Sequence, residues 1–158
     1  MYQPLSIHEV RSFAPTAWVG KYSQLSHLKT LRLPMIVLYE VEPNYGHWVA
    51  ILETPEGIEH FDSYGILPDN ELQWVPVEFR HESGQDVKHL LRMMYATGKK
   101  INYNSHRLQG KDTSTCGRWA ALRIMFSFLG TNAFYHMVKS VSASLGMTPD
   151  EMVSIAIS

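Results

Sequence analysis

The sequence predicts an α+β fold in which a small mixed sheet packs on a buried central helix. Apolar runs of strand length recur between turn signals in residues 33–64. Apolar residues at helical spacing follow, and the segment 117–129 is apolar enough for a helix buried on most sides. The 158 residues, 45% hydrophobic and 18% charged, are enough for one domain with a real core and too apolar for disorder. A single α+β domain is therefore expected.

The first half of the chain is expected to form one helix and three strands. Ser6 and Glu9 have the spacing of a capping box, which predicts a short helix from about Ile7. The predicted strands are residues 33–41 (LPMIVLYEV), 47–53 (HWVAILE) and 58–64 (IEHFDSY). The turns PNYG and TPEG separate them, so the three strands are expected to form an antiparallel meander.

The second half is expected to be mainly helical. Residues 86–97 carry Val87, Leu90, Leu91 and Met94 at i, i+3, i+4 and i+7, and Gly98 follows as a stop signal. A strand is expected at 99–104 (KKINYN), and helices at 117–129 and 134–145. Thr148, Pro149 and Glu151 are expected to begin a last helix. No repeat, linker or low-complexity segment interrupts the chain.

Several segment types are not expected. No apolar run approaches the roughly 20 residues that cross a bilayer, so no membrane partner is predicted. The N-terminal residues lack the basic start and apolar core of a signal peptide. One cysteine allows neither an internal disulfide nor a Cys2His2 zinc site, and reducing, intracellular surroundings fit best.

Charge is distributed unevenly along the chain. The net charge is −1, but residues 86–123 carry +6 and the remainder −7. The basic residues of this segment are Lys88, Arg92, Lys99, Lys100, Arg107, Lys111, Arg118 and Arg123. Two interpretations remain open: a nucleic-acid surface, or a solvated face that lies against a more acidic lobe.

The single cysteine, Cys116, lies where the polar run GKDTST gives way to the apolar segment 117–129. The first turn of a helix offers free N–H groups and a dipole that stabilise a thiolate. Gln109 lies seven residues upstream, so its amide can fold back beside the sulfur. A thiolate with an amide donor is half of an acyl-transfer site. The alternative is a buried structural cysteine.

The other half of such a site needs a base and a group that orients it. The chain has eight histidines, namely His8, His27, His47, His60, His81, His89, His106 and His136. His47 begins a predicted strand and Asp62 lies at the end of the next one. In a hairpin that turns at residues 54–57 these two positions are neighbours. His60 lies on the same strand as Asp62 and points along that strand, not across to Asp62 from a neighbouring one. The alternative for His47 is an ordinary surface residue at a strand end.

Taken in order, the motifs GHWVAIL, FDSYG and LQGKDTSTCGRW resemble those of the cysteine proteases grouped around the adenovirus-type maturation protease and the SUMO-specific proteases. The resemblance covers about residues 34–129. The spacing from Gln109 to Cys116 resembles the adenoviral members, whereas Asp62 in place of glutamate resembles the SUMO-specific ones. With the short chain, this mixture resembles proteases of double-jelly-roll DNA viruses, virophages and related mobile elements. The resemblance implies an adenain-like, papain-type cysteine protease domain over residues 1–158.

The resemblance also implies roles for the motif residues. Cys116 would be the nucleophile, His47 the general base, Asp62 the group that orients the imidazole, and Gln109 a donor to the oxyanion. Trp48 and Gly117 would contact substrate, and the alternative for Trp48 is a core aromatic residue on the buried face of its strand.

The implied function is that of an endopeptidase that processes viral capsid or core precursors at Gly-X-Gly or Gly-Gly sites. Two alternatives remain open: an isopeptidase that removes ubiquitin or a ubiquitin-like modifier, and an inactive scaffold or nucleic-acid-binding relative. The expected location is the virion, the host cytoplasm or a viral factory. No metal and no required cofactor is expected.

DNA or a peptide is left open as an activator. For weak DNA binding, Lys88, Arg92, Lys99 and Lys100 are the residues that would contact phosphates. Activation by a peptide that is disulfide-linked to the protein is not expected, because this linkage needs a second cysteine and the chain has only Cys116.

Overall fold

The computed structural model describes residues 3–158 and confirms the α+β class. One five-stranded sheet has the order β1-β2-β3-β4-β5. Its strands are β1 (Trp18–Lys21), β2 (Met35–Glu42), β3 (Tyr45–Thr54), β4 (Gly57–Phe61) and β5 (Ile101–Tyr103). The strands β2, β3 and β4 form the predicted antiparallel meander, whereas β1 and β5 are parallel to their neighbours. The sheet is therefore mixed, as expected.

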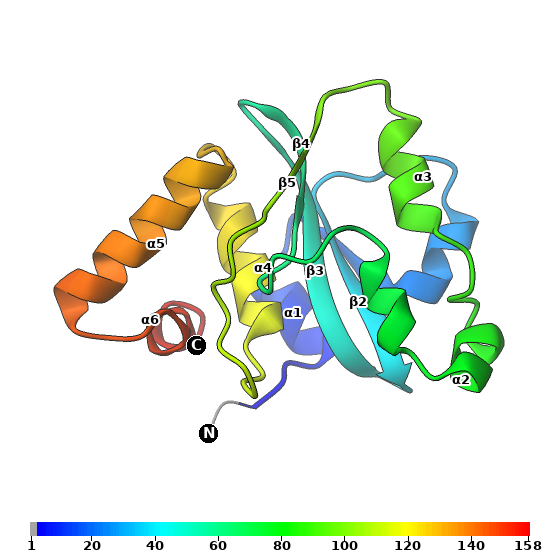
Figure 1. The fold of residues 1–158 in the computed structure, drawn as a ribbon, viewed down its shortest axis with the longest axis horizontal. Coiled ribbons are helices and arrows are strands. Elements are labelled where there is room, and N and C mark those ends of the chain that lie inside the picture. Colours follow the sequence, from blue (N-terminus) through cyan, green and yellow to red (C-terminus); the bar gives the residue numbers. More distant parts are fainter. Residues whose placement is uncertain (1–2) are drawn as a thin grey trace.

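Helices lie on both sides of this sheet. The α-helices are α1 (Ile7–Phe13), α2 (Val77–Glu82), α3 (His89–Tyr95), α4 (Cys116–Met125), α5 (Thr131–Leu145) and α6 (Pro149–Ala156), and two 3₁₀ helices are η1 (Tyr22–His27) and η2 (Asn70–Trp74). Figure 1 shows α1, α4, α5 and α6 on one side of the sheet and α2 and α3 on the other. Both capping boxes, at Ser6 and at Thr148, are present as predicted.

The strand β3 contributes to the core on both faces of the sheet. Trp48, Ala50 and Leu52 lie in the cluster shared with α4, whereas Val49 and Ile51 lie in the cluster on the opposite face. Alternate residues of a strand point to opposite faces, which explains this division. Because α4 packs directly on β3, it is the buried central helix that the sequence predicts.

Several elements differ from the sequence-based expectation. The elements β1, η1, η2 and α2 were not predicted, and α2 buries none of its residues, so it carries no apolar stripe to reveal it. The strand β4 ends at Phe61, and Asp62 begins a tight turn in which its carbonyl accepts from Gly65 N at 2.8 Å. Gly65 has φ +75°, a conformation that favours glycine.

The interior holds one charged pair that joins α4 to β4. Arg123 and Glu59 are both fully buried and form a two-pronged ion pair, with N–O distances of 2.8 and 2.9 Å. The same guanidinium donates to the carbonyls of Phe126 and Leu129, just beyond α4. This corrects the sequence-based interpretation of the basic segment, because Arg123 belongs to the core and not to a charged surface.

The longest helix, α5, has 15 residues. Among the described residues, no helix is both long enough and apolar enough to span a membrane.

Candidate active site

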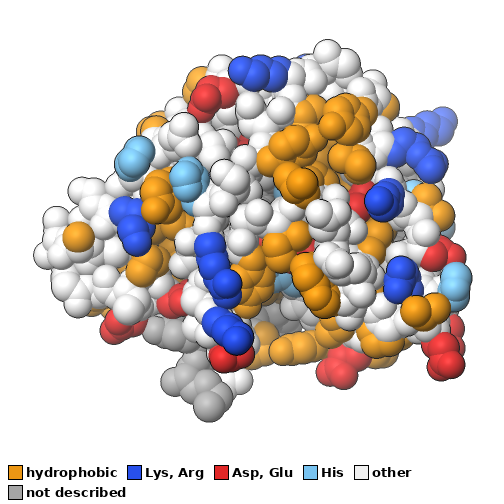
Figure 2. Space-filling view, viewed as in Figure 1, with side chains coloured by type: hydrophobic (Ala, Val, Ile, Leu, Met, Phe, Trp, Pro, Cys, Tyr) orange, Lys and Arg blue, Asp and Glu red, His pale blue; other side chains and the backbone are white. Residues whose placement is uncertain are grey.

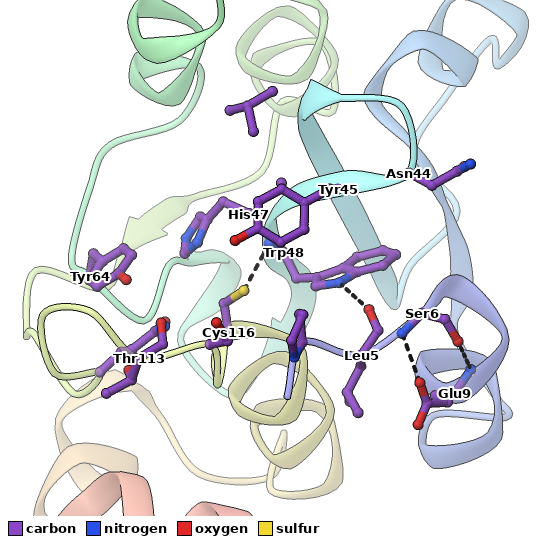
Figure 3. Close-up of a pocket in the computed structure, with 15 residues that line it drawn as sticks. Leu5, Ser6, Glu9, Asn44, Tyr45, His47, Trp48, Tyr64, Thr113 and Cys116 are labelled. Carbon is purple, nitrogen blue, oxygen red and sulfur yellow. Dashed lines mark hydrogen bonds between the residues drawn. The ribbon is translucent and has the colours of Figure 1, made fainter. Parts of the chain in front are cut away.

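A cleft at one end of the sheet brings together residues from four parts of the chain (Figure 3). Its volume is about 410 Å³. The residues that line it are Pro4, Leu5, Ser6, Glu9, Val41, Asn44, Tyr45, Gly46, His47, Trp48, Tyr64, Gln109, Thr113, Ser114 and Cys116. Three of the residues singled out by sequence for chemistry, His47, Gln109 and Cys116, are therefore in one cleft, and Asp62 lies behind His47, in contact with its imidazole.

Cys116 is the first residue of α4, as predicted, and its side chain is on the cleft side of the helix. The residue is 8% exposed, and its sulfur accepts a hydrogen bond from Trp48 N at 3.5 Å. Asp150 of α6 holds the preceding loop in place by accepting from Gly110 N at 2.7 Å and from the Thr115 hydroxyl at 2.6 Å. The position of the sulfur thus depends on α6 as well as on α4.

The predicted contact between His47 and Asp62 is confirmed. Nε2 of His47 lies 2.9 Å from Oδ1 of Asp62, a carboxylate that is 0% exposed. The same oxygen accepts from Tyr64 N at 2.8 Å, and Asn104 donates to the Asp62 carbonyl at 2.7 Å. The carboxylate is therefore held by its own turn, and it fixes the orientation of the imidazole.

Opposite charges in and beside the cleft stabilise each other. Burial alone would lower the pKa of His47, but the charge of Asp62, the nearby Cys116 and the hydrogen bond to Asp62 raise it well above the ordinary value. Burial would raise the pKa of Asp62, but the charge of His47 and hydrogen bonds lower it. Figure 3 shows the imidazole and the sulfur beside each other in the cleft. An imidazolium paired with the Asp62 carboxylate is therefore the favoured state of His47.

Gln109 lies in the cleft with its amide orientation fixed. Its Oε1 accepts from the Ser63 hydroxyl at 2.6 Å, and its Nε2 donates to the Thr113 carbonyl at 2.8 Å. An amide nitrogen carries two N–H donors, so one remains for a ligand. Sequence analysis did not identify Ser63, although it directly follows Asp62 in the chain.

The two residues expected to contact substrate have different positions. Trp48 belongs to the core and also lines the cleft, where its Nε1 donates to the Leu5 carbonyl at 3.3 Å, so its position is compatible with both interpretations. Gly117 does not line the cleft, which corrects the sequence-based expectation. A Cβ at this position would lie 3.1 Å from Cδ1 of Trp48 and 3.4 Å from Cβ of Leu5, so glycine here permits close packing beneath the cleft.

His60, the other histidine near Asp62, is not placed to act as a base. It is 1% exposed, does not line the cleft, and neither of its ring nitrogens has a hydrogen-bond partner among the described residues. Burial lowers the pKa of His60 to about 4, so the ring is neutral.

A second carboxyl, which sequence analysis missed, lies beside the imidazole. Oε1 of Glu71, in η2, is 3.6 Å from Nε2 of His47, and Glu71 is 9% exposed. Tyr64 stacks on the imidazole, with ring centroids 5.0 Å apart. The irregular segment after β4 gave no pattern from which to place Glu71.

Ligand atoms of His47, Asp62 and Glu71 lie within 4.8 Å of one another, a spacing at which three such groups can hold a metal ion. The hydrogen bond between His47 Nε2 and Asp62 already uses the nitrogen that would bind it. We therefore assign none of the three as a metal ligand.

The four basic residues proposed to contact DNA lie away from the cleft. Lys88, Arg92, Lys99 and Lys100 are exposed on α3 and on the segments that flank it, and Lys99 pairs with Glu53 at 3.4 Å. On the face shown in Figure 2, Lys and Arg side chains are spread among acidic and apolar ones and form no continuous basic surface. This distribution favours the interpretation as a solvated face.

The fold and the cleft define an α+β protein whose thiol lies beside an imidazole held by aspartate. The chain is 34% identical to "Uncharacterized protein V9" of Sputnik virophage over an alignment of 123 residues. The alignment covers 76% of this chain and 70% of that protein. The chain therefore belongs to the same family as this virophage protein. No established family model matches the chain.

Proposed function

We propose that this protein is a cysteine peptidase with an adenain-like, papain-type fold. The observation that carries the proposal is that Cys116, at the amino end of a buried helix, shares a cleft with His47, whose imidazole is hydrogen-bonded to Asp62. These are the nucleophile, base and orienting group that acyl transfer requires. The resemblance of the surrounding motifs to the adenovirus-type and SUMO-specific proteases supports the same assignment.

In the first half-reaction, the Cys116 thiolate attacks the scissile carbonyl carbon and forms a C–S bond. The oxyanion that develops receives hydrogen bonds from the free N–H of Gln109 and from the backbone N–H of Cys116 at the start of α4. As the C–N bond breaks, the imidazolium of His47 gives its proton to the leaving amine. The product is a thioester on Cys116 and a neutral His47.

In the second half-reaction, a water molecule replaces the amine. The neutral imidazole of His47 takes a proton from this water as its oxygen attacks the thioester carbon. The C–S bond then breaks, the acid product leaves, and the thiolate and imidazolium are restored. Asp62 stays ionised throughout and stabilises the charged imidazole in both half-reactions.

The proposed substrates are precursor proteins of a virus particle, cleaved at Gly-X-Gly or Gly-Gly. Trp48 and the Leu5 backbone it binds form one wall of the cleft directly beside the sulfur. A wall this close to the nucleophile favours residues without a side chain at the scissile bond. The virophage origin of the relative supports a viral substrate.

The test is incubation with Gly-X-Gly and Gly-Gly peptides and, in parallel, with C-terminal amides of ubiquitin-like proteins, followed by mass spectrometry. Cleavage of the peptides supports the endopeptidase proposal. Cleavage of the modifier amides alone would reassign the protein as an isopeptidase. If neither is cut, the proposal fails.

Replacing Gln109 by alanine is expected to reduce kcat by about 10²- to 10³-fold, with a smaller change in KM, because one oxyanion donor is lost. Steady-state kinetics on a cleaved peptide measure this effect. Gln73→Ala is a matched control, because Gln73 is exposed and lies outside the cleft. An equal loss in both variants would contradict the assigned role.

A further inference from the structure

Glu71 and Asp62 face each other across a buried space that offers few other hydrogen-bond donors. Oδ2 of Asp62 and Oε1 of Glu71 are both buried, and neither accepts a hydrogen bond from another of the described residues. A carboxyl oxygen of Asp62 and one of Glu71 lie within 4.8 Å of each other. Oε1 of Glu71 also lies only 3.6 Å from His47 Nε2, whose hydrogen bond goes to Asp62 at 2.9 Å. Two ionised carboxylates so close together would repel each other, whereas one shared proton converts the contact into a hydrogen bond.

The positive charges around Glu71 are too few to stabilise both Glu71 and Asp62 in their ionised forms. Among residues 3–158, His47 on β3 is the one cation in contact with Glu71, and Asp62 already neutralises it. The outer side of Glu71 faces a hollow lined by Tyr64, Ile66, Trp74, Arg107, Lys111 and Asp112. In the part of the chain that the structure describes, neither Arg107 nor Lys111 forms an ion pair with Glu71.

The segment that carries Glu71 is firmly held, so the contact does not depend on a mobile loop. Asp69, two residues earlier, accepts from the hydroxyls of Tyr22 and Tyr39 at 2.8 and 3.0 Å. Its second oxygen accepts from Leu91 N at 2.9 Å. Leu72, the next residue after Glu71, is buried in the core on that face of the sheet.

We propose that Glu71 is a positioning residue for the peptidase reaction: its neutral carboxyl donates a hydrogen bond to Asp62 and holds that carboxylate against Nε2 of His47. This inference rests on the proposed function. Ionisation of Glu71 removes the donor, places a second negative charge beside Asp62, and offers Nε2–H a competing acceptor. The orientation of the imidazole toward the sulfur is then lost.

The acid–base behaviour of the group agrees with this role. Burial raises the pKa of Glu71 to about 8 against the opposing charge of His47, and the charge of Asp62 adds to the rise. Because a raised pKa keeps a carboxyl neutral to higher pH, Glu71 is protonated at neutral pH and ionises as the pH rises through about 8. Activity is therefore expected to fall above that pH.

The experiment combines a carboxyl titration with pH–rate profiles for the wild type, Glu71→Gln and Glu71→Ala. In ¹³C spectra of the wild type, one glutamate carboxyl is expected to titrate near pH 8, and this titration should be absent in Glu71→Gln. An amide keeps an N–H donor but does not ionise, so Glu71→Gln should keep neutral-pH activity and lose the fall above pH 8. Glu71→Ala should lose about 10- to 100-fold in kcat at pH 7, a loss typical of removing a group that orients a functional side chain.

Glu78→Gln is the matched control, since Glu78 is exposed on α2 and undergoes the same chemical change. It should leave the titration and the pH profile unchanged. A Glu71 carboxyl that titrates near 4.5, or a Glu71→Gln enzyme with the same alkaline fall as the wild type, overturns the inference. If the wild type cleaves no peptide, the proposed function fails, and the titration alone decides whether Glu71 shares its proton with Asp62.

Discussion

Replacing Cys116 by alanine is expected to abolish peptide cleavage and to leave the fold intact. The sulfur is the nucleophile of the proposed reaction, and removal of a nucleophile from a catalytic triad lowers kcat on the order of 10⁶-fold. Alanine is smaller and apolar, and the side chain makes only one hydrogen bond, a weak one from Trp48 N. Cleavage rates and a urea unfolding curve, measured on the same preparation, check both halves of the expectation.

Cys116→Ser provides the chemical control, because it keeps the shape of the side chain but replaces the thiol by a hydroxyl that does not ionise near neutral pH. It should be as inactive as the alanine variant. Wild-type turnover retained by either variant would show that any cleavage has another source. It would also favour the scaffold or nucleic-acid-binding alternative for this family.

Replacing Glu59 by alanine is expected to cause the largest loss of stability. The change leaves the Arg123 guanidinium buried without its ion-pair partner, and breaking a buried pair costs about 3–5 kcal/mol. Since domains of this kind are stable by only about 5–15 kcal/mol, the change would remove a large fraction of the free energy of unfolding. The shift in the urea midpoint measures the loss.

The matched control is Glu53→Ala, on the same hairpin. Its pair with Lys99 is longer, with an N–O distance of 3.4 Å, and both side chains are more than half exposed, so little change in stability is expected. The double replacement Glu59→Leu with Arg123→Met should be less harmful than Glu59→Ala alone, because it leaves no buried charge. Equal urea midpoints for Glu53→Ala and Glu59→Ala would mean that the buried pair contributes no more stability than the exposed pair.

The part of the candidate site that local geometry determines was predictable from the sequence. The turn at residues 54–57 and the lengths of its two strands place His47 beside Asp62, and the hydrogen bond of 2.9 Å confirms this. The polar-to-apolar boundary located the amino end of α4 and hence Cys116. In each case the relevant contact follows from a hairpin or a helix start, both of which have local sequence signals.

The supporting residues were not predictable in this way. Asp150 reaches Gly110 and Thr115 from a separate helix 35 to 40 residues away in the chain. Glu71 approaches His47 from a 3₁₀ helix in an irregular stretch. Nothing periodic links these positions, so only the tertiary arrangement brings them together.

Burial also reversed one charge-based interpretation. In a list of charged residues, Arg123 appears as one more positive charge of a basic segment, whereas in the fold it is 0% exposed and paired with Glu59. Formal charge counts therefore overstate the positive surface of residues 86–123. The sequence does not reveal which arginine has an acidic partner on a strand that packs against its helix.

The presence of a single thiol in 158 residues, in the wall of the cleft, has a practical consequence. A maleimide fluorophore or a nitroxide spin label added to the unaltered chain can attach to one sulfur only, in one-to-one stoichiometry. Because the label attaches inside the cleft, its rate of attachment would fall when another molecule occupies the cleft. Occupancy by a candidate substrate could be followed optically, without engineering any other position.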